Sequence, residues 1–137
     1  EASDVMSTAG GATSISQIAA IAAMDESRDW LKSFLEHLTK NRDYAVEFIN
    51  KNIPQLHAYK PQATYLLYVD IKDLNCKADE FVDFLRKEVK LSVVPGGHNY
   101  FGDQSEGHIR ICIATSKEIL YEGLNRLKEG VEKFMRK

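Results

Sequence analysis

The chain has 137 residues, of which 44% are hydrophobic and 28% are charged, and this balance is typical of one soluble globular unit with its own core. Its formal net charge of -2 at pH 7 gives no electrostatic reason to expect nucleic acid or an anionic membrane as a partner. No apolar stretch approaches the roughly 20 residues that cross a bilayer, and no signal peptide opens the sequence, so a cytoplasmic protein is expected.

The N-terminal part begins with Glu1 instead of methionine, and its first dozen residues are small and polar, without apolar periodicity. This start indicates a piece of a longer protein. Apolar residues then recur at spacings of three and four over 12–24 and predict a helix, capped by Thr13 or Ser14. Because this helix is apolar on more than one face, we expect it to pack against a larger body outside the sequence.

Two helices and three strands are predicted in the middle of the chain. A long amphipathic helix covers 26–52 and ends before a proline. Two short strands follow over 55–59 and 64–71, joined by a hairpin-like connection. A second helix is predicted over 78–89, with acidic residues in its first turn, and then a short strand over 91–94.

A capping box of Thr115 and Glu118 predicts the start of a final helix, whose apolar residues recur at alternating spacings of four and three. The order of elements favours an α+β fold of two layers, in which helices cover one face of a small, mostly antiparallel sheet. No internal repeat or low-complexity tract interrupts this pattern.

The run 107–116 carries the strongest indication of function. Its period-two alternation puts Ile109, Ile111 and Ile113 on one face of a strand and Arg110 on the other. The β-branched isoleucines suit a half-buried face and anchor the strand to a core. A guanidinium held on such a strand is a fixed, planar fork for a carboxylate. The alternative interpretation is a surface arginine that pairs with a neighbouring acid.

Neither a disulfide framework nor a metal site is predicted. Cys76 and Cys112 are too few and too far apart for a disulfide framework, and both are expected to be free thiols. His108 and Cys112 share the strand face of Arg110, but no third or fourth ligand at metal spacing accompanies them, so no zinc site is expected.

Four motifs follow one another in the second half of the chain: Val-Val-Pro-Gly at 93–96, Phe-Gly at 101–102, Gly-x-Ile-Arg-x-x-x-Ala-Thr-Ser at 107–116, and Leu-x-x-Gly-Leu-x-Arg-Leu at 120–127. Their order resembles the C-terminal part of fold-type I aminotransferases, which depend on pyridoxal phosphate. The segment 7–20 is similar to the family segment that follows the cofactor-bearing lysine and opens a helix near the dimer interface. The segment 60–66 is similar to the family's Lys-Pro-x-Gly-Thr-Tyr-Leu entry into the small domain, with Ala63 where glycine is usual.

The resemblance implies a domain division and a role for Arg110. Residues 1–25 would come from the large domain and dimer-interface region, and 26–137 would form the small C-terminal domain. The parent enzyme would be a homodimeric aminotransferase that uses pyridoxal 5'-phosphate, and Arg110 would bind the α-carboxylate of its amino-acid substrate. Such an arginine orients the substrate over the cofactor, which lowers the reaction barrier.

The cofactor-bearing lysine is expected outside this sequence. Pyridoxal phosphate needs a lysine, and in the family that lysine precedes the segment resembled by 7–20. Seven lysines fall on predicted solvent faces or loop edges: Lys32, Lys40, Lys72, Lys77, Lys90, Lys117 and Lys128. No catalytic residue and no cofactor-binding residue is therefore assigned, and the 137 residues alone should be inactive.

Other interpretations stay open. Asp29-Trp30-Leu31 and Asn41-Arg42-Asp43-Tyr44 resemble the carbon–sulfur lyase branch of the family, which cleaves cystathionine and shares the carboxylate-binding arginine. A stand-alone α+β interaction domain is an alternative from a different class. His98, Asn99 and Tyr100 could tune substrate specificity, although a solvated loop also explains them. Ser7, Thr8, Thr13 and Ser14 could reach a phosphate across a dimer interface, and helix capping explains the last two equally well.

Overall fold

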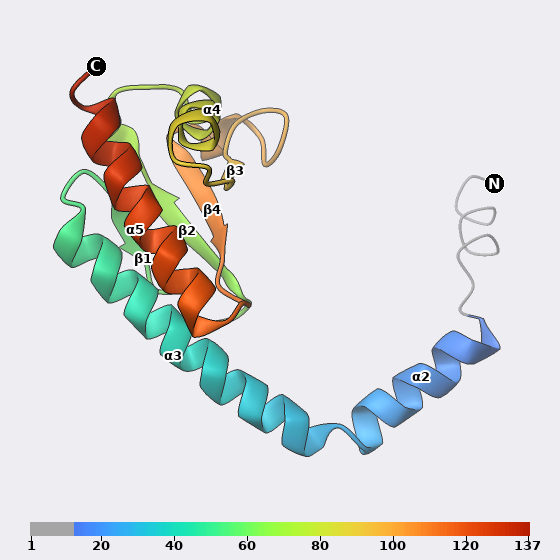
Figure 1. Ribbon diagram of the computed structural model, residues 1–137. Helices are drawn as coiled ribbons and strands as arrows, with labels where there is room; N and C mark the ends of the chain where they lie inside the picture. The colour runs from blue at the N-terminus through green and yellow to red at the C-terminus, as the bar shows by residue number, and fades with distance from the viewer. Residues whose placement is uncertain (1–12) are drawn as a thin grey trace, which may run out of the picture. The chain divides into compact units, whose positions relative to one another are not determined.

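The computed structural model describes residues 13–137, which divide into a first compact unit that ends at Glu36 and a second, His37–Lys137. The predictions for Ser7, Thr8 and the rest of 1–12 lie outside the described residues. The first unit holds helix α2 (Ser14–Asp25) and the first residues of helix α3 (Arg28–Asn52) (Figure 1). No helix in the described part of the chain is long and apolar enough to cross a membrane.

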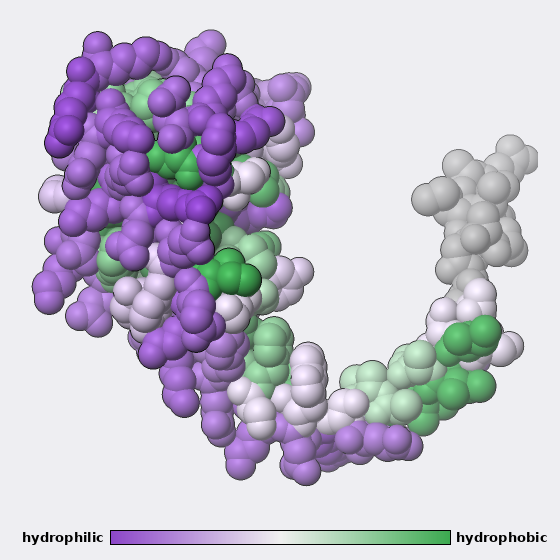
Figure 2. Space-filling model, in the orientation of Figure 1, coloured by the Kyte–Doolittle hydropathy of each residue, from purple (hydrophilic) through white to green (hydrophobic). Residues whose placement is uncertain are grey.

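Helix α2 forms as predicted and has no buried residue. Thr13 is its N-cap, because the Thr13 hydroxyl accepts a hydrogen bond from the backbone N–H of Ser16 at 3.2 Å. Its large apolar side chains are exposed by 63–80%: Ile15, Ile18, Ile21 and Met24. Figure 2 shows hydrophobic residues gathered along this helix. Such exposure means that most of the apolar surface of these four side chains is open to solvent in the structure.

The second unit is built on a four-stranded sheet in the order β1-β2-β4-β3, with every neighbouring pair antiparallel. The strands are short: β1 is His57–Tyr59, β2 is Leu66–Asp70, β3 is Val94–Pro95 and β4 is His108–Cys112. The two central strands are therefore β2 and β4. The α+β class and the antiparallel sheet predicted from the sequence are confirmed.

Helices α3, α4 (Ala78–Glu88) and α5 (Lys117–Phe134) contribute to one buried core with the sheet (Figure 1). The core-facing residues of the strands are Ala58, Leu67, Val69 and Ile109, each at most 2% exposed. Helices α4 and α5 approach closely at Gly130, where a Cβ atom would lie 2.2 Å from Leu85 Cδ2. Because the helices pack on the face that carries these four strand residues, the opposite face of the sheet remains available for other contacts.

The strand predicted over 91–94 is wrong in position, since the structure has β3 at Val94–Pro95. The reason is a competing hydrogen bond, because the backbone N–H of Leu91 donates to the carbonyl of Leu85 in α4 at 3.2 Å. Lys90 before it adopts a left-handed backbone with φ 56°. The chain therefore remains bonded to the C-terminal end of α4 as far as Leu91, and it begins to pair with β4 only at Val94.

The predicted capping box is wrong by one residue. Ser116 is the N-cap of α5, with the extended backbone that a cap requires, and its hydroxyl accepts from the N–H of Ile119 at 3.3 Å. The carbonyl of Thr115 instead accepts from the side chain of Asn41 at 2.9 Å. Asn41, only 3% exposed, also donates to the carbonyl of Ile113 at 2.9 Å. This buried amide therefore fixes α3 to the chain that leaves β4.

Candidate carboxylate-binding site

Arg110 lies in the middle of β4, between two neighbouring strands. Its Cα partners are Tyr68 on β2 and Val94 on β3. Ile109 beside it and Ile113 beyond the strand are 0% and 1% exposed, so the apolar face of this segment is fixed in the core. Because side chains alternate along a strand, Arg110 projects from the face opposite to Ile109 and is half-buried there. The predicted placement of Arg110 on the polar face is confirmed.

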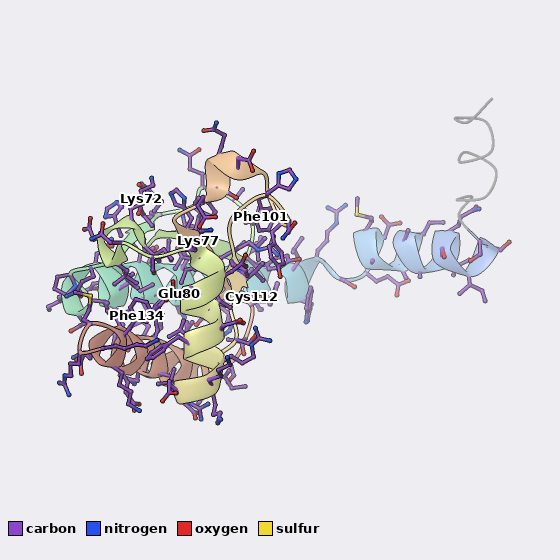
Figure 3. The ribbon with its side chains drawn as sticks, turned by 90° about the horizontal axis from the view of Figure 1, so that it is seen from above. Lys72, Lys77, Glu80, Phe101, Cys112 and Phe134 are labelled. Carbon is purple, nitrogen blue, oxygen red and sulfur yellow. The ribbon has the colours of Figure 1, made fainter. Side chains whose placement is uncertain are left out.

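The guanidinium of Arg110 lies over an aromatic ring. Its Cζ atom lies 4.4 Å from the centroid of the Phe101 ring. Phe101, labelled in Figure 3, belongs to the loop between β3 and β4. Among residues 13–137, no carboxylate lies within ion-pair distance of Arg110. The alternative of a surface arginine paired with a neighbouring acid therefore fails for the described residues.

Arg110 borders two cavities. The first has a volume of about 370 Å³ and is lined by Tyr68, Phe101, Gln104, Ser105 and Arg110. The second has a volume of about 350 Å³ and lies between Arg110, the chain before β3 and helix α5. Its lining is mainly apolar, and neither lining set contains Asp, Glu or Lys. Arg110 is thus the one charged group at both cavities, an arrangement that suits an anion from outside the described chain.

The loop that carries Phe101 is held closed by Ser105. The Ser105 hydroxyl accepts from the N–H of Gly97 at 2.6 Å and donates to the carbonyl of Gly102 at 2.7 Å. The backbone N–H of Phe101 donates to the carbonyl of Gly97 at 3.0 Å. Gly97 and Gly102 have φ 108° and 84°, a conformation that side-chain-bearing residues rarely adopt. Ser105 was not among the predicted site residues, and only the density of glycines around it marks this loop in the sequence.

His108 has a packing role in this structure. Its ring stacks on Tyr68 with centroids 4.6 Å apart and is 9% exposed. Its Nδ1 lies 3.1 Å from the carbonyl of Glu106, and its Nε2 lies 3.6 Å from Asp70. Burial raises the pKa of Asp70, but the backbone N–H and the ammonium of Lys72 outweigh burial, and the net pKa is lowered. The stacked rings of His108 and Tyr68 thus pack beside Arg110 on the same face of the sheet.

The predicted absence of a metal site is compatible with the described residues, where no group of three or more His, Cys, Asp or Glu side chains is arranged to hold an ion. Both cysteines are free thiols, as the sequence predicted. Cys112 at the end of β4 is exposed, whereas Cys76 is half-buried and its pKa is raised, first by burial.

Residues 98–100 line neither of the two cavities that border Arg110. His98 lies 3.0 Å from Asp103 and is solvent-exposed. Asn99 and Tyr100 line a third cavity, of about 490 Å³, whose lining does not include Arg110. A solvated loop explains these residues, and their role in substrate specificity stays an untested prediction.

The predicted solvent positions of the lysines are largely confirmed. The exposed ones are Lys32, Lys40, Lys72, Lys77, Lys90 and Lys117, while Lys128 is half-buried. None of them lines either cavity beside Arg110. The described residues therefore do not provide an attachment point for pyridoxal phosphate next to the arginine.

Comparisons with known proteins show which proteins the chain is related to. No family model matches the chain. Over 90% of its length the chain is 29% identical to an aspartate aminotransferase of Pyrococcus horikoshii, and over 89% it is 28% identical to the cystathionine beta-lyase PatB of Bacillus subtilis. A solved structure of a pyridoxal-phosphate-bound protein from Clostridium difficile 630, assigned as an aminotransferase, is 34% identical over 94% of the chain with a TM-score of 0.84. The chain is homologous to the C-terminal part of fold-type I aminotransferases and carbon–sulfur lyases.

This homology confirms the resemblance that the motifs indicated. The chain spans 31% of the length of each of these two relatives and 33% of the solved structure. The part that it matches contains the Arg110 strand and the helices that support it. The larger part of such an enzyme has no counterpart in the 137 residues.

Proposed function

We propose that this chain supplies the substrate-carboxylate site of a longer pyridoxal-phosphate-dependent aminotransferase that acts on amino acids. The observation that carries the proposal is Arg110, a half-buried arginine on a central strand with an aromatic partner and no acid within reach among residues 13–137. A guanidinium in this state keeps its in-plane N–H donors for a carboxylate. The relatives of the chain that are named as aminotransferases support this reaction type.

The chemistry of this chain is binding and orientation. When bound by the rest of the enzyme, pyridoxal phosphate supplies the electron sink for reactions at the amino-acid Cα. The described residues do not fit that cofactor, because no lysine borders the arginine site. Arg110 would hold both carboxylate oxygens through two parallel hydrogen bonds, which fixes the rotation of the amino acid about its Cα.

The proposal is tested by kinetics of the full-length protein that contains this sequence. Arg110→Ala should raise KM for the preferred amino acid and lower kcat/KM by roughly 100-fold or more, because a charge-assisted bidentate contact is lost. Arg110→Lys keeps the charge without the fork and should recover only part of the loss. Unchanged kinetics in Arg110→Ala would remove the arginine from the substrate site.

A carbon–sulfur lyase is the second candidate. It is favoured by relatives of similar identity, such as PatB of Bacillus subtilis and a 31% identical protein of Mycobacterium leprae named as a cystathionine beta-lyase. Both reactions would use the same carboxylate-binding arginine. Assay of the full-length protein with L-cystathionine separates them, since a lyase releases pyruvate and ammonia without a keto-acid acceptor.

Three further expectations belong to the same proposal. The parent enzyme would be a homodimer in the cytoplasm, with 1–25 contributing to the large domain or dimer interface. The isoleucines of α2 support this packing, because Ile15, Ile18 and Ile21 are 63–80% exposed. They also disfavour a stand-alone interaction domain, which would have to leave this surface in water. Size-exclusion chromatography of the full-length protein with light scattering tests the dimer.

A further inference from the structure

Arg110 is half-buried, and its partner is an aromatic ring instead of the carboxylate that usually pairs with an arginine. A carboxylate would occupy the in-plane N–H donors of the guanidinium and lower its capacity for a second anion. An aromatic ring instead contacts the flat face and leaves the edge free. The Cζ of Arg110 lies over the Phe101 ring, 4.4 Å from its centroid, and no ion pair with a carboxylate is found among residues 13–137.

We propose that Phe101 is a positioning residue, which holds the guanidinium plane of Arg110 in the orientation that receives the substrate carboxylate. This inference rests on the proposed function of Arg110. Phe101 is 45% exposed, a large share for a phenylalanine, so core packing does not account for it. Both side chains border the cavity of about 370 Å³ in which an anion would meet the arginine.

The loop restricts the ring, so the contact is preorganised. The carbonyl of Gly97 accepts the N–H groups of Tyr100 and Phe101, at 3.1 and 3.0 Å. The buried hydroxyl of Ser105 then bridges Gly97 and Gly102, which precede and follow Phe101 in the sequence. A bidentate contact with a carboxylate depends on the orientation of the guanidinium plane. An arginine side chain has many rotamers, so it loses less entropy on binding the carboxylate when a neighbouring ring already holds it in place.

The experiment uses the full-length protein and the L-amino acid of highest activity in a panel of the twenty standard ones and L-cystathionine. Phe101→Leu keeps an apolar side chain but removes the aromatic face, and it should raise KM about 2- to 10-fold. We expect kcat to change less than KM. Phe101→Tyr keeps the face and should restore KM, and Phe101→Met replaces Phe101→Leu if the latter does not fold.

Tyr59→Leu is the matched control, because Tyr59 is an aromatic of similar exposure, 48%, in the edge strand β1, and it lines neither cavity that borders Arg110. It should leave KM unchanged. The decisive measurement compares kcat/KM of the Arg110→Ala variant with kcat/KM of the Phe101→Leu, Arg110→Ala double variant. This ratio can be measured even when KM is too high to determine. A positioning role predicts no further loss there.

The outcomes separate this inference from the function on which it rests. If Phe101→Leu leaves KM unchanged while Arg110→Ala raises it strongly, the positioning role is refuted and the carboxylate site stands. An equal loss from Phe101→Leu with and without Arg110 also refutes the positioning role, because the ring then acts through the fold. If Arg110→Ala has no effect, the proposed function itself fails.

Discussion

Gly130 in α5 allows the close contact between α4 and α5, and its replacement by alanine sets two effects of opposite sign against each other. Alanine favours a helix over glycine by about 1 kcal/mol. The added Cβ would lie 2.2 Å from Leu85 Cδ2 and 3.3 Å from Val89 Cγ2, and Leu85 is 0% exposed. Overpacking of a core costs about 1–3 kcal/mol, so Gly130→Ala should destabilise the chain by up to about 2 kcal/mol.

Gly123 in the same helix provides the matched control. A Cβ there would meet only Leu91 Cδ1 at 3.9 Å, an ordinary contact. Gly123→Ala should therefore stabilise the chain by up to about 1 kcal/mol. Urea denaturation followed by circular dichroism measures both variants, and Leu85→Ala should lower the cost of Gly130→Ala in the double mutant. Equal stabilisation by the two alanines would refute the packing argument.

Three more predictions concern the second unit. Asn41→Ala should destabilise the chain by about 1–3 kcal/mol in urea, because the carbonyl of Ile113 loses its side-chain donor and the carbonyl of Thr115 keeps only His37 Nε2 at 2.8 Å. A change below about 0.5 kcal/mol would contradict this. The guanidinium of Arg42 and then a lysine ammonium lower the pKa of Asp43 to about 2. Asp43 is half-exposed, so the stabilisation that it contributes, measured against Asp43→Asn, should stay below about 1 kcal/mol. This stabilisation should be complete above about pH 4 and should vanish as the pH falls through about 2. A stabilisation that increases on acidification would contradict the prediction. With a thiol reagent at neutral pH, exposed Cys112 should react before Cys76, whose pKa is raised by burial; the reverse order in mass spectrometry would refute this.

The periodicity of the sequence located the helices and the central strand well, because burial of apolar side chains follows backbone geometry. The alternation around Arg110 and the spacing along α5 are both reproduced by the structure. The errors in the predicted element boundaries arose where backbone hydrogen bonds determine the local conformation. The N–H of Leu91 bonds to the end of α4, which displaces β3, and the backbone of Ser116, not Thr115, has the cap conformation.

The candidate site was predicted only in part. Arg110 was identified from its strand, but its contact with Phe101 depends on how a glycine-rich loop closes. That closure is made by Ser105, whose partners Gly97 and Gly102 are eight and three residues away. No periodic pattern encodes such a turn, since each contact depends on one backbone conformation. The role of Asn41 was missed for a similar reason, because its partners are more than 70 residues distant.

The most direct test of the central claim is a crystal structure of the full-length protein with a bound, unreactive amino-acid analogue that keeps the α-carboxylate. We predict that both carboxylate oxygens lie about 2.7–2.9 Å from two guanidinium nitrogens of Arg110. The Phe101 ring should remain stacked on the opposite side of the fork. A carboxylate bound elsewhere, with Arg110 paired to an acid from the rest of the protein, would contradict the account.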